Sequence, residues 1–178
     1  MIIPETPTRR HIFGLILFPA TFFLVLPLTL SFLLRIPAPS ALALVAAVLV
    51  IEYGAIAPAV VLGLDLPFSM AVSSLVCLGV LFTSFEIFDL LSLRSGKIRA
   101  FLARVEGIRI TCGLRRYGIL ALVPGMIVVG FYVCPAAAWI IGWRKGEAIA
   151  VMYAGFLASS MAVALLTAGL LPVVFGPG

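Results

Sequence analysis

Charged side chains are scarce in this sequence. Only 11% of its 178 residues are Asp, Glu, Lys or Arg, and 63% are hydrophobic, whereas soluble domains carry about 25% charged and about half apolar residues. A soluble domain has too little interior to hide so much apolar surface, so the composition excludes that class. It indicates an integral membrane protein.

Residues that carry enzyme and metal chemistry are also few. The chain has one histidine, His11, and three scattered cysteines, Cys77, Cys112 and Cys134, without a CxxC pair. No zinc-protease motif, nucleophile elbow or glycine-rich phosphate loop occurs, and three cysteines so placed favour neither a disulfide framework nor a thiolate metal site. We therefore expect no enzyme activity, no cofactor and no metal, and cysteines that pack as small apolar side chains.

What the sequence has instead is five long apolar runs. A helix needs about 20 apolar residues to cross a bilayer, and every run reaches that length. The first run is longer than the apolar core of a secretory signal, about 7 to 15 residues, so we expect a retained helix, kinked at Pro19 and Pro27. The chain length fits one membrane domain over residues 1–178. The runs are 11–34, 41–64, 68–91, 119–141 and 148–171.

Two of these runs are interrupted near their middles. The second contains Glu52-Tyr53-Gly54 and then Pro58, and the fourth contains Pro124-Gly125, Gly130 and Pro135. An ionisable side chain or unwound backbone at membrane depth is tolerated only where it is buried in protein or faces water. Each half of a broken run reaches only about half-way across the bilayer. The breaks are therefore the first places to look for a functional site.

The distribution of positive charge predicts the topology. Arg9 and Arg10 precede the first run, and seven basic residues lie within 94–116. Lys and Arg concentrate on the cytoplasmic side of a membrane protein, and five crossings would leave one of these groups outside. The conflict disappears if runs 41–64 and 119–141 are re-entrant hairpins. We therefore predict three spanning helices and two hairpins, with the N-terminus, the basic loop and Arg144-Lys145 in the cytoplasm. The net charge of +5 then records orientation, and we expect no nucleic-acid partner.

An internal repeat agrees with this topology. Shifting the chain by 79 positions places residues 62–72 over 141–151, with matching glycine, alanine, valine and apolar positions. The shift predicts an inverted repeat of 41–91 and 118–171, joined by a basic connection, 92–117. Inverted repeats place transport sites near the midplane, between broken helices. Apolar residues at helical spacing within the connection predict a cytoplasmic amphipathic helix lying in the membrane interface.

Charged side chains outside the breaks have two interpretations each. Glu86 and Asp89 share a helix face and either pair with Arg94 or Lys97 at the cytoplasmic interface or form a second acidic site for cations. The basic side chains either anchor the topology or bind phosphate or lipid headgroups. Tyr132 and Trp139 are expected at the membrane interface. The phosphate or headgroup candidates are Arg115, Arg116, Arg144 and Lys145.

Two segments resemble the small multidrug export family. They are 52–58 (EYGAIAP) and 117–125 (YGILALVPG), separated by the basic connection and followed by a turn at Gly142 and a helix rich in small residues. The resemblance covers residues 41–170. That family is in turn similar to the DedA and VTT-domain proteins, which have paired re-entrant helices and are implicated in lipid-carrier translocation and in drug or proton transport. Gly54 stands where the family pattern has an arginine.

We therefore predict a small multi-pass transporter of the plasma membrane, similar to small multidrug export proteins and coupled to protons through Glu52. Its partners would be the bilayer, protons, a small amphipathic molecule or lipid carrier as substrate, and further copies of the chain. Two alternatives stay open: a DedA-like lipid-carrier translocase, and a structural subunit in which Glu52 only stabilises its hairpin. The coupling and substrate candidates are Glu52, Tyr53, Gly54, Pro58, Pro124, Gly125, Glu86 and Asp89.

Overall fold

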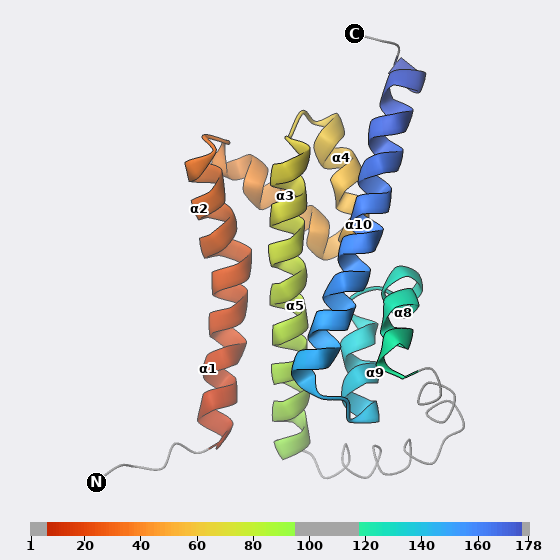
Figure 1. Cartoon of the computed structure of the whole chain (residues 1–178). Coiled ribbons are helices and arrows are strands. Elements are labelled where there is room, and N and C mark those ends of the chain that lie inside the picture. Colours follow the sequence, from red (N-terminus) through yellow and green to blue (C-terminus); the bar gives the residue numbers. More distant parts are fainter. Residues whose placement is uncertain (1–6, 95–117, 176–178) are drawn as a thin grey trace.

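The computed structural model describes residues 7–94 and 118–175, and every regular element within those ranges is a helix (Figure 1). The predicted amphipathic helix, together with Cys112, Arg115 and Arg116, lies outside the described residues. The elements are α1 (Pro7–Pro19), a π-helix (Ala20–Val25), α2 (Leu26–Leu33), α3 (Ala38–Ile51), a 3-10 turn (Glu52–Ala55), α4 (Ile56–Val61), α5 (Leu66–Arg94), a 3-10 turn (Ile119–Ala121), α8 (Leu122–Val129), α9 (Val133–Ile141) and α10 (Lys145–Phe175).

Four helical segments are long and apolar enough to cross a membrane by length and composition, which confirms the predicted all-α, multi-pass class. Their outer surfaces carry large apolar side chains, of which Phe32 is 87% exposed and Val50 is 81% exposed. Apolar exposure on this scale is what a lipid-facing surface requires. The four segments are Phe13–Leu33, Ala38–Val61, Leu66–Leu91 and Lys145–Thr167. The second of them contains a 3-10 turn at Glu52 and is not one continuous α-helix.

Two of the predicted breaks are present and two are not. The second run breaks at Glu52, where α3 gives way to a 3-10 turn. The fourth run was expected to break at Pro124-Gly125, Gly130 and Pro135, but Pro124-Gly125 lies inside α8 and Pro135 lies inside α9. Pro124 is the third residue of that helix, where a missing backbone N–H breaks no helical hydrogen bond. The break occurs at Gly130, whose φ of 86° ends α8.

The first long helix changes its winding between its two prolines. Residues Ala20–Val25 form a π-helix, a form in which the hydrogen bonds skip one extra residue. This segment packs against α5 at Gly79. A Cβ atom at Gly79 would lie 2.6 Å from Phe22 Cβ and 2.5 Å from Phe23 Cε1. The close approach of the first helix to α5 therefore depends on glycine at this position.

Two pairs of short helices each fold back on themselves. In Figure 1, α3 slants away from the upper end of the molecule and α4 returns to it, whereas α8 rises from the lower end and α9 returns there. The reversal of the first pair is also evident from one pocket of about 300 Å³, which is lined by Ser40 near the start of α3 and by Leu62 just after α4. We call α3–α4 the first hairpin and α8–α9 the second hairpin.

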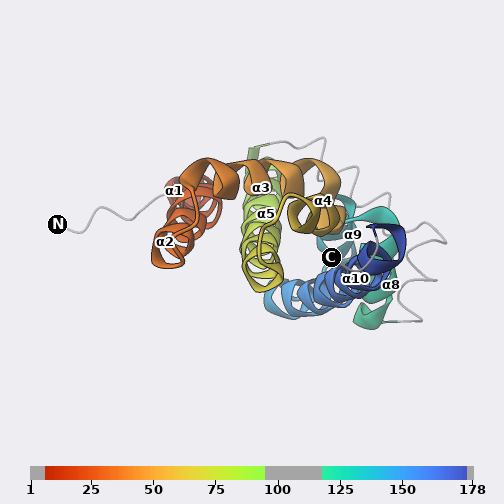
Figure 2. The same cartoon turned by 90° about the horizontal axis from the view of Figure 1, so that it is seen from above.

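The two long helices α5 and α10 run in opposite directions through the middle of the fold. Seen from above, α5 lies between the α1–α2 helix and α10, and α3 crosses one side of it (Figure 2). The core between these elements is apolar. Phe68 and Phe85 of α5, Phe131 at the tip of the second hairpin and Phe156 of α10 are all at most 2% exposed.

The turns that lead into α5 and α10 have the same geometry. Gly63 and Gly142 both have positive φ, 81° and 78°. In the first turn, Leu64 N–H donates to the Ala59 carbonyl, and 79 positions later Trp143 N–H donates to the Ala138 carbonyl. Each turn therefore ends a short helix with the same backbone bond and starts a long one.

Candidate functional site

Glu52 occupies a backbone conformation that suits glycine. Its φ is 58° and its ψ is −131°, a region in which a side chain crowds its own backbone, and such outliers cost about 1–3 kcal/mol. Glu52 ends α3 and begins the 3-10 turn. The chain therefore keeps a glutamate at the bend of the first hairpin, where glycine would relieve the backbone strain.

The Glu52 carboxylate lies against the tip of the second hairpin. It accepts a hydrogen bond from the Phe131 backbone N–H, and a Cβ atom at Gly130 would overlap its two oxygens. Gly130 is thus required twice, by its positive φ and by the carboxylate beside it.

Two tyrosines join the hairpins reciprocally. Tyr53 donates its hydroxyl to the Ile127 carbonyl at 2.9 Å, and Tyr132 donates its hydroxyl to the Leu49 carbonyl. Both acceptors lie in the last turn of a helix, α8 and α3, where carbonyls lack a helical partner. In lipid such free carbonyls are costly. Each hairpin therefore caps the helix end of the other, and Glu52 lies between them.

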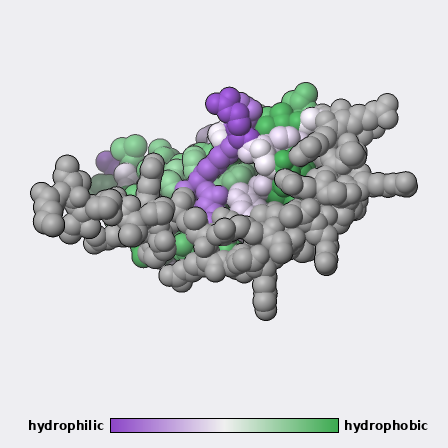
Figure 3. Space-filling view, turned by 90° about the horizontal axis from the view of Figure 1, so that it is seen from below, coloured by the Kyte–Doolittle hydropathy of each residue, from purple (hydrophilic) through white to green (hydrophobic). Residues whose placement is uncertain are grey.

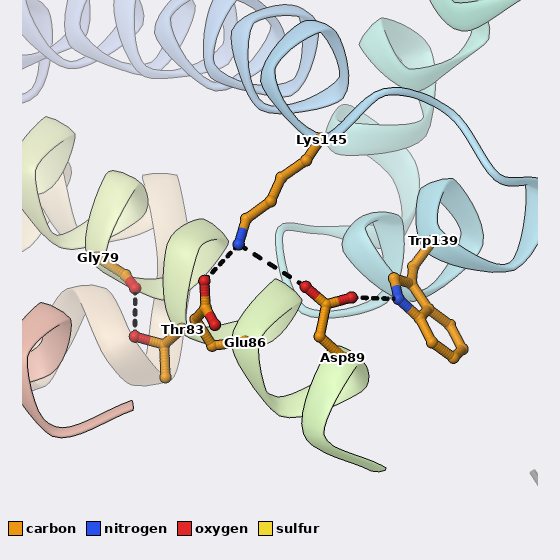
Figure 4. A network of polar contacts seen from close by, with 6 residues as sticks. All are labelled: Gly79, Thr83, Glu86, Asp89, Trp139 and Lys145. Carbon is orange, nitrogen blue, oxygen red and sulfur yellow. Dashed lines mark hydrogen bonds and ion pairs between the residues drawn. The ribbon is translucent and has the colours of Figure 1, made fainter. Parts of the chain in front are cut away.

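A second polar cluster lies at the lower ends of α5, α9 and α10 (Figure 4). Lys145 Nζ is 2.5 Å from Glu86 Oε1 and 3.9 Å from Asp89 Oδ2. Trp139 Nε1 donates to Asp89 Oδ1 at 2.9 Å, and the Lys145 ammonium is 5.9 Å from the centre of the Phe85 ring. We call Glu86, Asp89, Trp139 and Lys145 the lower polar cluster.

Viewed from below, a hydrophilic band crosses the described part of the lower face between hydrophobic regions (Figure 3). Next to Lys145 in sequence, the side chain of Arg144 is 85% exposed and forms a 2.7 Å ion pair with Glu147, three residues further along the chain. Two of the four predicted phosphate ligands, Arg144 and Lys145, thus already have carboxylate partners.

The remaining predicted site residues are spread over the two hairpins. Tyr53 is at the site itself, and Pro58 lines the pocket inside the first hairpin. A Cβ at Gly54 would lie 3.0 Å from Ile51 Cγ2 within the same hairpin. A Cβ at Gly125 would lie 3.3 Å from Cys134 Sγ, so the Pro124-Gly125 region packs α8 on α9. The second hairpin meets Glu52 through residues 130–132 instead.

Two aromatic residues that were expected at the membrane interface have partners that the sequence did not predict. The Tyr132 hydroxyl bonds to the first hairpin, and Trp139 donates to Asp89 in the lower polar cluster. Their position at an interface stays a prediction. Among residues 130–132, which meet Glu52, only Gly130 carried a sequence signal, as a glycine within an apolar run. The tyrosine bonds carried none, because their acceptors are backbone carbonyls. Comparison with family models, characterised proteins and solved structures finds no match to this chain.

Proposed function

We propose that this protein is a small plasma-membrane transporter whose two hairpins are re-entrant and form its site around Glu52. The observation that carries the proposal is the meeting of both hairpin tips at this one carboxylate, with reciprocal tyrosine bonds on either side. Broken helices that meet in this way are how secondary transporters build a site inside the bilayer. A purely structural carboxylate gives no reason for the strained backbone of Glu52.

The lengths of the hairpin arms support the re-entrant arrangement. The nine residues of α9 span about 14 Å at 1.5 Å per residue, which is about half of a 30 Å hydrocarbon core. The 3-10 turn and α4 together contain ten residues and are of similar length. Hairpins of this size entering from opposite sides meet near the midplane. The N-terminus, the basic connection and Arg144 then face the cytoplasm, in agreement with the positive-inside rule.

Correspondences at a spacing of 79 residues support an inverted repeat. Tyr53 and Tyr132 are 79 positions apart, and each donates its hydroxyl to a last-turn carbonyl of the opposite hairpin, although the two acceptors are 78 positions apart. Gly63 and Gly142 share a positive φ at the same spacing, and the helices that follow them run in opposite directions (Figure 1). Two such halves would rock against each other around a fixed central site.

Glu52 is the proposed coupling residue. Its described hydrogen-bond partner is a donor, the Phe131 backbone N–H, and the hydroxyls of Tyr53 and Tyr132 donate to backbone carbonyls instead of to the carboxylate. Such surroundings suit exchange of a proton better than coordination of a metal cation, which needs several oxygen ligands. The proposed substrate class is small amphipathic molecules, as in small multidrug export.

A lipid-carrier translocase of DedA-like type is the second candidate. An apolar groove of about 490 Å³ opens between the first helix and α3, and its lining residues include Phe23, Leu42 and Leu49. A groove of this kind would hold an acyl or polyprenyl chain, which gains about 0.8 kcal/mol per buried CH₂ group. The headgroup would then reach the charged residues at a membrane face.

Reconstitution with both substrate classes tests the proposal. We expect purified protein in liposomes with a pH gradient to move cationic amphipathic dyes, and Glu52→Gln to reduce that flux by at least tenfold. Glutamine keeps the size and hydrogen bonding of the side chain but cannot exchange a proton. The folded yield of Glu52→Gln should match that of the unmodified protein, whereas Glu52→Ala removes a hydrogen-bond acceptor and is expected to lower it.

The alternatives predict other outcomes in the same liposomes. Flipping of a fluorescent phospholipid or prenyl phosphate without dye transport would favour the translocase. Inactivity with both substrates would favour the structural subunit. Full dye transport by Glu52→Gln with an unchanged pH dependence would exclude proton coupling through this residue.

A further inference from the structure

The lower polar cluster joins parts of the fold that a transport cycle must separate. Glu86 and Asp89 lie on α5, which belongs to the first proposed repeat. Lys145 begins α10 and Trp139 lies on α9, and both helices belong to the second. All contacts of the cluster named above cross this boundary. The cluster therefore ties the two halves together at the lower end (Figure 4).

The other end of the fold has an apolar counterpart of this cluster. At the spacing of 79 residues, Trp139 corresponds to Val60, Lys145 to Leu66 and Glu86 to Leu165. None of these can form an ion pair. At the upper end the first hairpin instead encloses the pocket of about 300 Å³ that includes Ser40 and Leu62. The two ends of the proposed repeat therefore differ: ion pairs join the halves at the lower end, and apolar residues take their places at the upper end.

We propose that the lower polar cluster is a gate, which holds the lower, cytoplasmic end of the transport pathway closed while the upper end is open. This inference rests on the proposed function. A transporter with two similar halves needs something to make its two end states differ, and here an ion pair at one end provides the difference. Lys145 is the central gating residue, because its ammonium group lies between both carboxylates.

The exposure of the cluster suits a contact that opens and closes. The side chain of Glu86 is 13% exposed and that of Lys145 is 36% exposed. An ion pair with this much access to water contributes little net stability and exchanges readily with solvation. A fully buried pair would resist separation, since each charge would then stay out of water without the opposite charge that offsets its desolvation. Trp139 covers one side of the cluster by holding Asp89 in place.

The native Cys134 is a reporter of gate opening. It is 4% exposed and lies on α9, between the cluster and Glu52. In protein with Cys77→Ala and Cys112→Ser, a membrane-impermeant thiol reagent would be added separately to each side of oriented membrane vesicles. We expect Lys145→Gln to raise the labelling rate of Cys134 about fivefold from the cytoplasmic side alone. The swapped pair Glu86→Lys with Lys145→Glu should return the rate to that of the parent protein.

Arg144→Gln is the matched control. This variant removes one positive charge, as Lys145→Gln does, but at the adjacent position. The partner of Arg144 is Glu147, which lies in α10 itself, so their ion pair crosses no boundary between the halves. We expect its labelling rate to equal that of the parent. The gate is refuted if Lys145→Gln labels no faster than Arg144→Gln, if the swapped pair stays as reactive as the single variant, or if labelling rises equally from both sides, which indicates unfolding.

The labelling rate of Cys134 is measured without any transport of substrate, so the gate and the transporter can be rejected separately. One-sided labelling with no substrate flux would retain the gate as a conformational switch and reject the transporter. Flux that depends on Glu52, with no change in labelling, would retain the transporter and reject the gate.

Discussion

At the scale of single residues, Glu52 combines two features that each oppose folding. Its backbone has a positive φ, and its carboxylate lies among apolar helices, with Phe131 as its described backbone donor. Strain of this kind persists where the surrounding structure imposes it, and it concentrates at functional sites. Gly130 is the complementary residue, because the absence of its side chain makes room for the carboxylate.

Gly130→Ala is therefore expected to be more damaging than an ordinary glycine substitution. Its new Cβ would overlap the Glu52 oxygens at a φ of 86°, and we expect a loss of about 3 kcal/mol or more. Gly142→Ala is the control, since its φ is 78° but nothing lies within 4 Å. It should cost only about 1 kcal/mol. Thermal unfolding in detergent would compare them, and equal melting temperatures would contradict the close contact.

At the scale of secondary-structure elements, each hairpin supplies a side-chain cap to a helix end of the other. The last-turn carbonyls of α3 and α8 accept hydroxyls from the opposite hairpin, Leu49 from Tyr132 and Ile127 from Tyr53. Each bond shields a carbonyl that lipid could not satisfy. The two hairpins therefore stabilise each other as a pair.

Because both bonds hold the same pair of tips, their contributions should not be additive. Tyr53→Phe and Tyr132→Phe should each cost about 1 kcal/mol, and the double variant should differ from their sum by at least about 0.5 kcal/mol. The measurement is a double-mutant cycle in detergent unfolding. Thr167→Val is the control, because its hydroxyl bonds within α10, to Val163. Additive losses would show that the hairpins do not act as a unit.

At the scale of the whole molecule, the proposed topology places both loops of the first hairpin on the same side. Pro37 directly precedes α3 and Asp65 directly precedes α5, and both of these helices begin at the upper end of the molecule in Figure 1. In a cysteine-free background, single cysteines at these two positions should be labelled by an impermeant reagent from outside the cell. A cysteine at Arg144 should be labelled only from the cytoplasm. Opposite sidedness of positions 37 and 65 would mean that the first hairpin crosses the membrane.

The sequence by itself determined the membrane class, the helical fold and the break at Glu52. Apolar runs of bilayer length and a charge within one of them are local properties, which composition and spacing reveal. Of the breaks predicted in the fourth run, the one at Gly130 is present and the one at Pro124-Gly125 is not, because Pro124 suits the first turn of a helix as well as it disrupts an interior. The predicted inverted repeat and the roles of the site residues stay predictions.

Only the tertiary structure decided what surrounds Glu52 and what binds Glu86 and Asp89. Residues 130–132 reach Glu52 across almost eighty positions, and the tyrosine bonds end on backbone carbonyls, which look alike in every residue. The acidic pair was expected to bind Arg94 or Lys97, whose side chains lie outside the described part of the chain, and the structure brings Lys145 and Trp139 to it. Spacing along a helix predicts which residues share a face, but the partner of that face depends on how helices distant in sequence pack.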